Sequence, residues 1–201
     1  MTAHDVVSEL HGYLRDARDA LLWKLDGLGE YDMRRPMTPS GTNLLGLVKH
    51  SACSHLRYFI GVFDRPTDPA LSWLTSGIGP NAEFWVDADR TSAEIIDGTR
   101  RAWALADGAI AELSPDAPGR VAWWGGEAVT LHHVLVHITA ETQRHAGHAD
   151  VLRELIDGSA GLLPRYDNVQ IKDDAQRATF VEQVEKAAGA ATLREPTDND
   201  E

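Results

Sequence analysis

The spacing of the apolar residues restricts the fold of this chain more than any other feature of its sequence. Near the N-terminus they recur three and four positions apart, at Val6, Leu10, Tyr13, Leu14, Ala17, Leu21, Leu25 and Leu28. Such spacing is typical of a helix that buries one face. An alternation of polar and apolar residues longer than four residues occurs only around residues 120–128. The sequence therefore predicts an all-α protein.

Four long helices are predicted, over about residues 6–28, 43–63, 91–113 and 130–157, followed by a C-terminal helix over residues 173–191. Thr91 and Glu94 form a capping-box pattern at the start of the third helix. Thr130 fits the N-cap of the fourth helix, and Gly158 fits the position just after its last turn. Both ends of this fourth helix are therefore predicted.

The connecting segments complete the expected architecture. Residues 29–42 are rich in proline, glycine and polar residues, so we expect a loop there. Residues 64–90 mix proline and glycine with large apolar residues, so we expect short helical pieces there or a lid over a site, with a packed crossover connection as the simpler interpretation. We expect a four-helix bundle with a C-terminal extension. Residues 192–201 are expected to form a flexible acidic tail.

Charge and composition exclude several classes of partner. The chain has 19 Lys and Arg against 31 Asp and Glu, a formal net charge of −12, which repels phosphate backbones and argues against a nucleic-acid partner. No run of 18 apolar residues exists, so no membrane span is expected. Cys53 is the only cysteine, which excludes an internal disulfide and favours a cytoplasmic protein.

The fourth predicted helix carries most of the residues that suggest chemistry. Five of the nine histidines of the chain fall within it, at His132, His133, His137, His145 and His148. At about 100° per residue, the last three of them share one stripe with Glu141. Apolar residues flank this stripe, so it is expected to face inward, where polar groups need a partner. A buried metal ion would supply one.

Two spacings on this stripe fit a shared ion, because His137 with Glu141 and Glu141 with His145 are both four residues apart. A third ligand must come from a facing helix, and His50 is the best-placed candidate. Two histidines and one carboxylate leave coordination positions open, which is the pattern of a catalytic ion. The alternative is that these histidines are ordinary core or surface residues.

These residues carry a family resemblance. The pattern Glu141-x-x-x-His145-x-Gly-His148, together with the segment that ends at His50 and the Trp-Gly-Gly-Glu turn at Glu127, resembles the DinB-like superfamily. Within it, the chain is similar to an actinobacterial branch related to the mycothiol-dependent maleylpyruvate isomerases. The resemblance covers about residues 5–185.

The resemblance implies an up-down-down-up four-helix bundle, commonly a homodimer, with a divalent metal held by three side chains. Carried over to this chain, the ligands are His50, Glu141 and His145, which leaves His137 as a neighbour. His55 stands where relatives often have an acidic residue, and its position about 140° from His50 makes it a non-ligand. Residues 1–191 are then a single metal-binding domain. Zinc is the expected metal, with nickel, manganese and iron as alternatives.

The resemblance also implies an enzyme that activates a low-molecular-weight thiol, such as mycothiol, for S-transfer or isomerisation of a small-molecule substrate. His148 is expected to be a catalytic residue that handles the released proton, or else a packing residue. Cys53 is expected to be a packed core thiol rather than a nucleophile. Two other functions compete with this interpretation: a non-enzymatic metal-binding stress-response protein, and a non-haem iron oxygenase.

Overall fold

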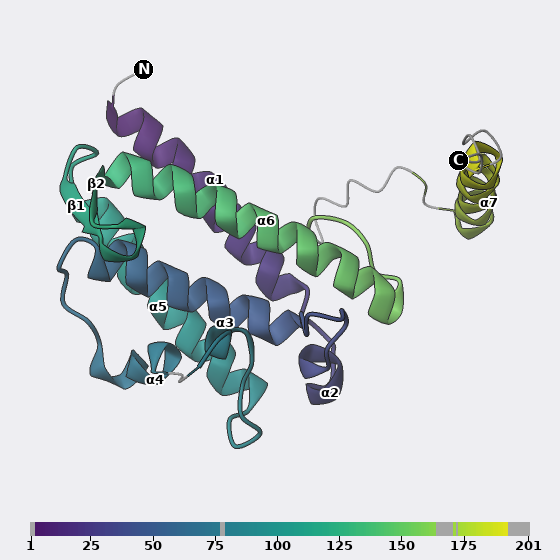
Figure 1. Ribbon diagram of the computed structural model, residues 1–201, viewed down its shortest axis with the longest axis horizontal. Helices are drawn as coiled ribbons and strands as arrows, with labels where there is room; N and C mark the ends of the chain where they lie inside the picture. Colours follow the sequence, from purple (N-terminus) through teal and green to yellow (C-terminus); the bar gives the residue numbers. More distant parts are fainter. Residues whose placement is uncertain (1–2, 77–78, 164–170, 172, 193–201) are drawn as a thin grey trace, which may run out of the picture.

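The computed structural model describes residues 3–76, 79–163, 171 and 173–192, and its architecture is mostly helical (Figure 1). The elements, in order, are α1 (Ala3–Trp23), α2 (Glu30–Arg34), α3 (Leu44–His55), the π-helix η1 (Leu56–Gly61), η2 (Pro69–Leu71), α4 (Ser72–Thr75), η3 (Ala82–Phe84), α5 (Ser92–Glu112), β1 (Pro118–Val121), η4 (Ala122–Trp124), β2 (Glu127–Thr130), α6 (Leu131–Asp157) and α7 (Asp174–Thr192). The predicted predominance of helix is confirmed, and the described residues also form a two-stranded hairpin. Most of the predicted acidic tail, residues 193–201, lies outside the described residues.

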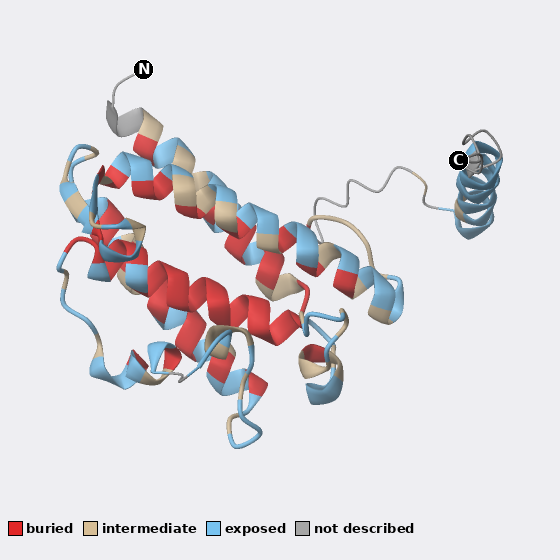
Figure 2. Ribbon diagram, viewed as in Figure 1, coloured by how far each residue is buried: buried red, intermediate tan, exposed pale blue. Residues whose placement is uncertain are grey.

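The long helices pack against one another around α3. Helix α1 lies along α6, and α3 contacts both α5 and α6 (Figure 1). Every residue of α3 is buried, including its polar ones (Figure 2). Polar groups on such a helix need partners inside the protein, because water does not reach them. Helix α7 is mostly exposed and lies apart from the packed helices in Figure 1.

The packed helices enclose two apolar clusters, and the polar residues of the predicted site lie between them. One cluster contains Ala52 on α3 and Ile138 on α6. The other contains Val48 on α3 and Ala146 on α6. On both helices, the segment that carries the predicted metal ligands lies between the residues of one cluster and the residues of the other. The two polar segments are therefore held opposite each other by the apolar packing on both sides.

The predicted helix ends are largely confirmed. Thr91 and Glu94 form the complete capping box of α5. Thr130 caps α6 by accepting a hydrogen bond from the backbone N–H of His133, and Gly158 follows the last turn with φ of 77°. Such a positive φ is easily adopted only by glycine, which explains why the helix ends there.

Three parts of the first half of the chain differ from the prediction. Helix α1 ends at Trp23 rather than near residue 28, because the amides of Leu25 and Asp26 bond to carbonyls only three residues back and Gly27 takes φ of 75°. The segment expected to be only a loop contains the short helix α2. The predicted helix over residues 43–63 is continuous, but it widens to a π-helix over its last turns. π-Helical turns occur frequently at functional sites.

The connection between α3 and α5 contains short helical pieces, as predicted: η2, α4 and η3. The hairpin pairs β1 and β2 in antiparallel register, from Pro118 opposite Thr130 to Val121 opposite Glu127. Its strands lead directly into α6 and so fix where that helix begins. No described helix has both the length and the apolar character that crossing a membrane requires.

A buried polar cluster joins α1, α3 and α5. The fully buried ring of His55 donates from Nδ1 to the carbonyl of Ser51 at 2.6 Å and accepts at Nε2 from Nε of Arg18 at 3.0 Å. Arg18 also pairs with Asp107 at 2.5 Å. Burial, and next the charge of Arg18, lower the pKa of His55 to about 3. His55 is thus a neutral structural residue.

The neutral state of His55 predicts a loss of stability in acid. An unfolded histidine has a pKa of about 6.5, so between that value and about 3 the unfolded chain binds a proton that the native chain does not. We expect the wild type to lose about 2 kcal/mol more than His55→Gln between pH 7.5 and 5, at 1.36 kcal/mol per pKa unit. Urea unfolding with a chelator present measures this difference. Equal pH dependence of the two proteins would contradict it.

Candidate metal centre

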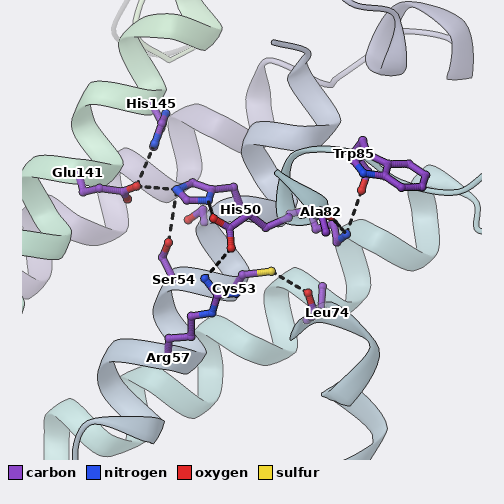
Figure 3. A network of polar contacts seen from close by, with 12 residues as sticks. His50, Cys53, Ser54, Arg57, Leu74, Ala82, Trp85, Glu141 and His145 are labelled. Atoms are coloured by element: carbon purple, nitrogen blue, oxygen red, sulfur yellow. Dashed lines mark hydrogen bonds and ion pairs between the residues drawn. The ribbon is translucent and has the colours of Figure 1, made fainter. Parts of the chain in front are cut away.

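Three potential metal ligands meet between α3 and α6. Atoms of His50, Glu141 and His145 lie within 4.8 Å of one another. The Oε1 atom of Glu141 lies 2.6 Å from Nε2 of His50 and 2.9 Å from Nε2 of His145. Figure 3 shows one oxygen of this carboxylate contacting both imidazole rings, each of which points a nitrogen toward it. These are the three residues that the family resemblance implies.

The two helices explain why these side chains converge. Glu141 and His145 are four residues apart on α6, so they stand on one face a single turn apart. His50 extends toward them from α3, which packs against α6. The side chains of the three residues are mostly buried, with exposed fractions of 11%, 23% and 14% for His50, Glu141 and His145.

The charges in the cluster favour a cation next to Glu141. Burial alone would raise the pKa of Glu141, but hydrogen bonds from His145 and His50 lower it to about 2. Burial would likewise lower the pKa of His50, but its hydrogen bond to Glu141 and the nearby carboxylate of Glu83 raise it to about 9. Both shifts favour a positive charge beside the carboxylate of Glu141, and a metal cation would supply one.

The donor set fits a divalent metal ion. Two imidazole nitrogens and one carboxylate oxygen are ligands that zinc and other borderline divalent ions accept. The second carboxylate oxygen of Glu141, Oε2, is buried and has no hydrogen-bond partner among the described residues. A buried carboxylate oxygen without a partner is costly, and coordination of a cation by this carboxylate would remove that cost.

The other histidine that fitted the helical spacing, His137, lies outside the cluster. Its ring packs against Tyr58 at 5.1 Å and Trp124 at 4.7 Å between centroids. Trp123 donates from Nε1 to the hydroxyl of Tyr58 at 3.1 Å and is 52% exposed. His137 and these aromatic residues thus form a wall one turn before Glu141 rather than part of the donor set.

The remaining candidates take different places. His148 is exposed, and its Nδ1 lies 3.4 Å from Nδ1 of His145, on the ring edge away from Glu141. His55 faces the cluster of Arg18 instead of the donors. Cys53 is buried and donates its thiol to the carbonyl of Leu74 at 2.8 Å. Burial raises the pKa of Cys53 to about 11, so it is a packed thiol and not a nucleophile at neutral pH.

Two residues that the sequence did not indicate also contact His50. The ring of Phe84 stacks on the imidazole with centroids 4.1 Å apart and an angle of 16°. The Oε1 atom of Glu83 lies 3.4 Å from Nδ1 of His50. Both belong to η3, in the connection between α3 and α5. The sequence offered only one signal for them, namely large apolar residues in a segment otherwise rich in proline and glycine.

The comparison with protein families decides the relationship. The family model for mycothiol-S-transferase matches residues 9–158, from within α1 to just past the end of α6. The chain belongs to this family. The match confirms the resemblance to mycothiol-dependent proteins and includes all three donors and His148. No curated protein matches the sequence.

Proposed function

We propose that this protein is a metal-dependent thiol transferase that uses mycothiol or a similar low-molecular-weight thiol. The observation that carries the proposal is the convergence of His50, Glu141 and His145 in a chain of the mycothiol-S-transferase family. Three protein ligands are typical of a catalytic ion, because a fourth position stays available for a substrate. The substrate class is a small electrophile that accepts the sulfur atom.

His50, Glu141 and His145 would hold the ion between α3 and α6. A divalent cation at this place would act as a Lewis acid that lowers the pKa of a coordinated thiol. In the transfer, the sulfur forms a bond to the electrophilic carbon while the leaving group departs with its bonding electrons. The wall of Tyr58, Trp123, Trp124 and His137 begins one turn before Glu141 on α6 and would keep water from part of this space.

His148 is proposed to receive the proton that the thiol releases. Its ring is exposed and lies next to His145, so it can exchange protons with water without entering the donor set. We expect His148→Gln to keep full metal occupancy and an unchanged unfolding temperature while turnover falls by about 100-fold, the lower range for a general base. Unchanged turnover would remove His148 from the mechanism, and a lower unfolding temperature alone would make it a packing residue.

Several finer features belong to the same proposal. They are zinc as the native metal, an up-down-down-up four-helix bundle, a single metal-binding domain over residues 1–191, a homodimer, and a location in the reducing cytoplasm, where a thiol cosubstrate is stable. Size measurement in solution tests the dimer, and metal analysis tests the zinc.

Reconstitution of the metal-free protein tests the function. The protein is loaded under anaerobic conditions with zinc, nickel, manganese or ferrous iron, and thiol consumption is followed with a panel of electrophiles. We expect turnover in the loaded wild type and none in His50→Ala. Two histidines and a carboxylate also describe the non-haem iron triad. If only the iron-loaded protein takes up oxygen, and no thiol is consumed, the protein is therefore an oxygenase and not a transferase.

A further inference from the structure

A short segment of the connection between α3 and α5, residues 82–85, lies across α3 beside His50; we refer to it as the strap. The buried ammonium group of Lys49 donates to the carbonyls of Ala82 at 2.7 Å and Trp85 at 2.9 Å. The side-chain amide of Asn43 donates to the carbonyl of Phe84 at 3.0 Å. Both ends of the strap are therefore tied to α3, the helix that carries His50.

The sequence of α3 is adapted to the close approach of the strap. Gly46 lies under the carbonyl of Phe84, and a Cβ atom at this position would stand 1.9 Å from that oxygen. Gly46 is within a regular helix, where its backbone conformation does not require glycine. The absence of a side chain here therefore serves the contact between the strap and α3.

The strap brings a carboxylate to the free edge of the His50 ring. Nε2 of His50 faces Glu141, while Nδ1 is buried and makes no hydrogen bond among the described residues. The nearest anionic atom is Oε1 of Glu83, at 3.4 Å. The other carboxylate oxygen of Glu83 accepts a hydrogen bond from Arg57 at 2.6 Å, which orients the group. Phe84 stacks on the face of the same ring and limits its rotation.

We propose that Glu83 is a positioning residue for the metal ligand His50. A carboxylate at Nδ1 holds the proton on that nitrogen, leaves the lone pair of Nε2 for the ion and increases the basicity of the ring. Histidine ligands in metalloproteins almost always have such an outer partner. The inference rests on the proposed function, because it requires that His50 binds a metal. The strap is then a functional part of the metal centre.

Substitution of Glu83 by glutamine tests the proposal through metal binding rather than activity. The variant keeps the size of the side chain and removes its charge. We expect the zinc affinity, measured by competition with a chromophoric chelator, to fall about 10-fold, at the low end of the range for outer-shell partners. The absorption spectrum of the cobalt-loaded protein is expected to shift, because the basicity of one ligand changes.

Two control variants separate positioning from simple anchoring of the strap. Glu112→Gln breaks a comparable ion pair with Arg65 far from the donors and is expected to bind zinc like the wild type. Arg57→Gln also breaks the ion pair between Arg57 and Glu83, but it leaves the Glu83 carboxylate next to His50. The zinc affinity of this variant is therefore expected to fall less than 3-fold. Unfolding of the metal-free proteins records any structural damage.

The outcomes distinguish this inference from the proposed function. A wild type that binds no zinc would overturn both. A wild type that binds zinc, with Glu83→Gln binding equally well and giving the same cobalt spectrum, would overturn the role of Glu83 alone. Equal losses of affinity in Glu83→Gln and Arg57→Gln, with equal losses of metal-free stability, would also overturn it, because Glu83 would then act only as an anchor.

Discussion

Replacement of Glu141 by alanine is expected to abolish metal binding. One oxygen of the Glu141 carboxylate contacts Nε2 of both His50 and His145, so its removal takes one of three ligands and leaves two imidazoles without a neighbouring anion at these nitrogens. The affinity is expected to fall by more than about 100-fold, the upper end of the effect seen for outer-shell partners alone. Competition with a chromophoric chelator measures the change.

His137→Ala is the matched control for this variant. His137 stands on the same helix one turn before Glu141 and fitted the same four-residue spacing, but its ring packs against aromatic residues. We expect this variant to bind metal like the wild type. Metal retained by Glu141→Ala and lost by His137→Ala would show that the wrong pair of residues on α6 was assigned.

Replacement of Gly46 by alanine is expected to weaken metal binding without touching a ligand. The added methyl group would overlap the carbonyl of Phe84, so the strap must move away from α3 and carry Glu83 and Phe84 away from His50. We expect about a 10-fold loss of zinc affinity. Overpacking of this kind is also expected to lower the free energy of unfolding by about 2 kcal/mol.

Gly108→Ala supplies the control for the glycine substitution. Gly108 lies within α5, and a Cβ atom there would meet nothing within 4 Å. Alanine is a better helix former than glycine, so this variant is expected to gain about 0.5–1 kcal/mol of stability and to bind zinc normally. A lower free energy of unfolding in Gly46→Ala and a higher one in Gly108→Ala would show that the contact with the strap, and not the loss of a helical glycine, causes the effect of Gly46→Ala. A Gly46→Ala protein as stable and as zinc-competent as the wild type would contradict the proposed contact.

The helices could be predicted from the sequence because each depends on local information. Apolar spacing reports which face is buried, and the caps at Thr91 and Thr130 are local hydrogen bonds. The change to a π-helix at Leu56 could not be predicted in this way. The apolar spacing of the predicted helix continues unchanged through the π-helix, and no residue type there indicates that the turn widens.

The candidate site was only partly predictable. The spacing on α6 indicated Glu141 but left His137 and His145 equivalent, because both are one turn away from it. Only the family resemblance chose between them, and in the structure the facing helix places His50 next to Glu141 and His145. Glu83 lies 33 residues beyond His50 in a segment without periodicity. Its contact with His50 depends on how the strap crosses α3, which no local pattern encodes.

Metal analysis of the purified protein shows directly whether the three donors hold an ion. The protein is prepared under metal-replete conditions, freed of loosely bound ions, and its metal content per chain is measured for the wild type and for His50→Ala. We expect one divalent ion per chain in the wild type and none in the variant, because His50 is the ligand from α3 that completes the cluster. A wild type without bound metal, or a variant that retains a full equivalent, would contradict it.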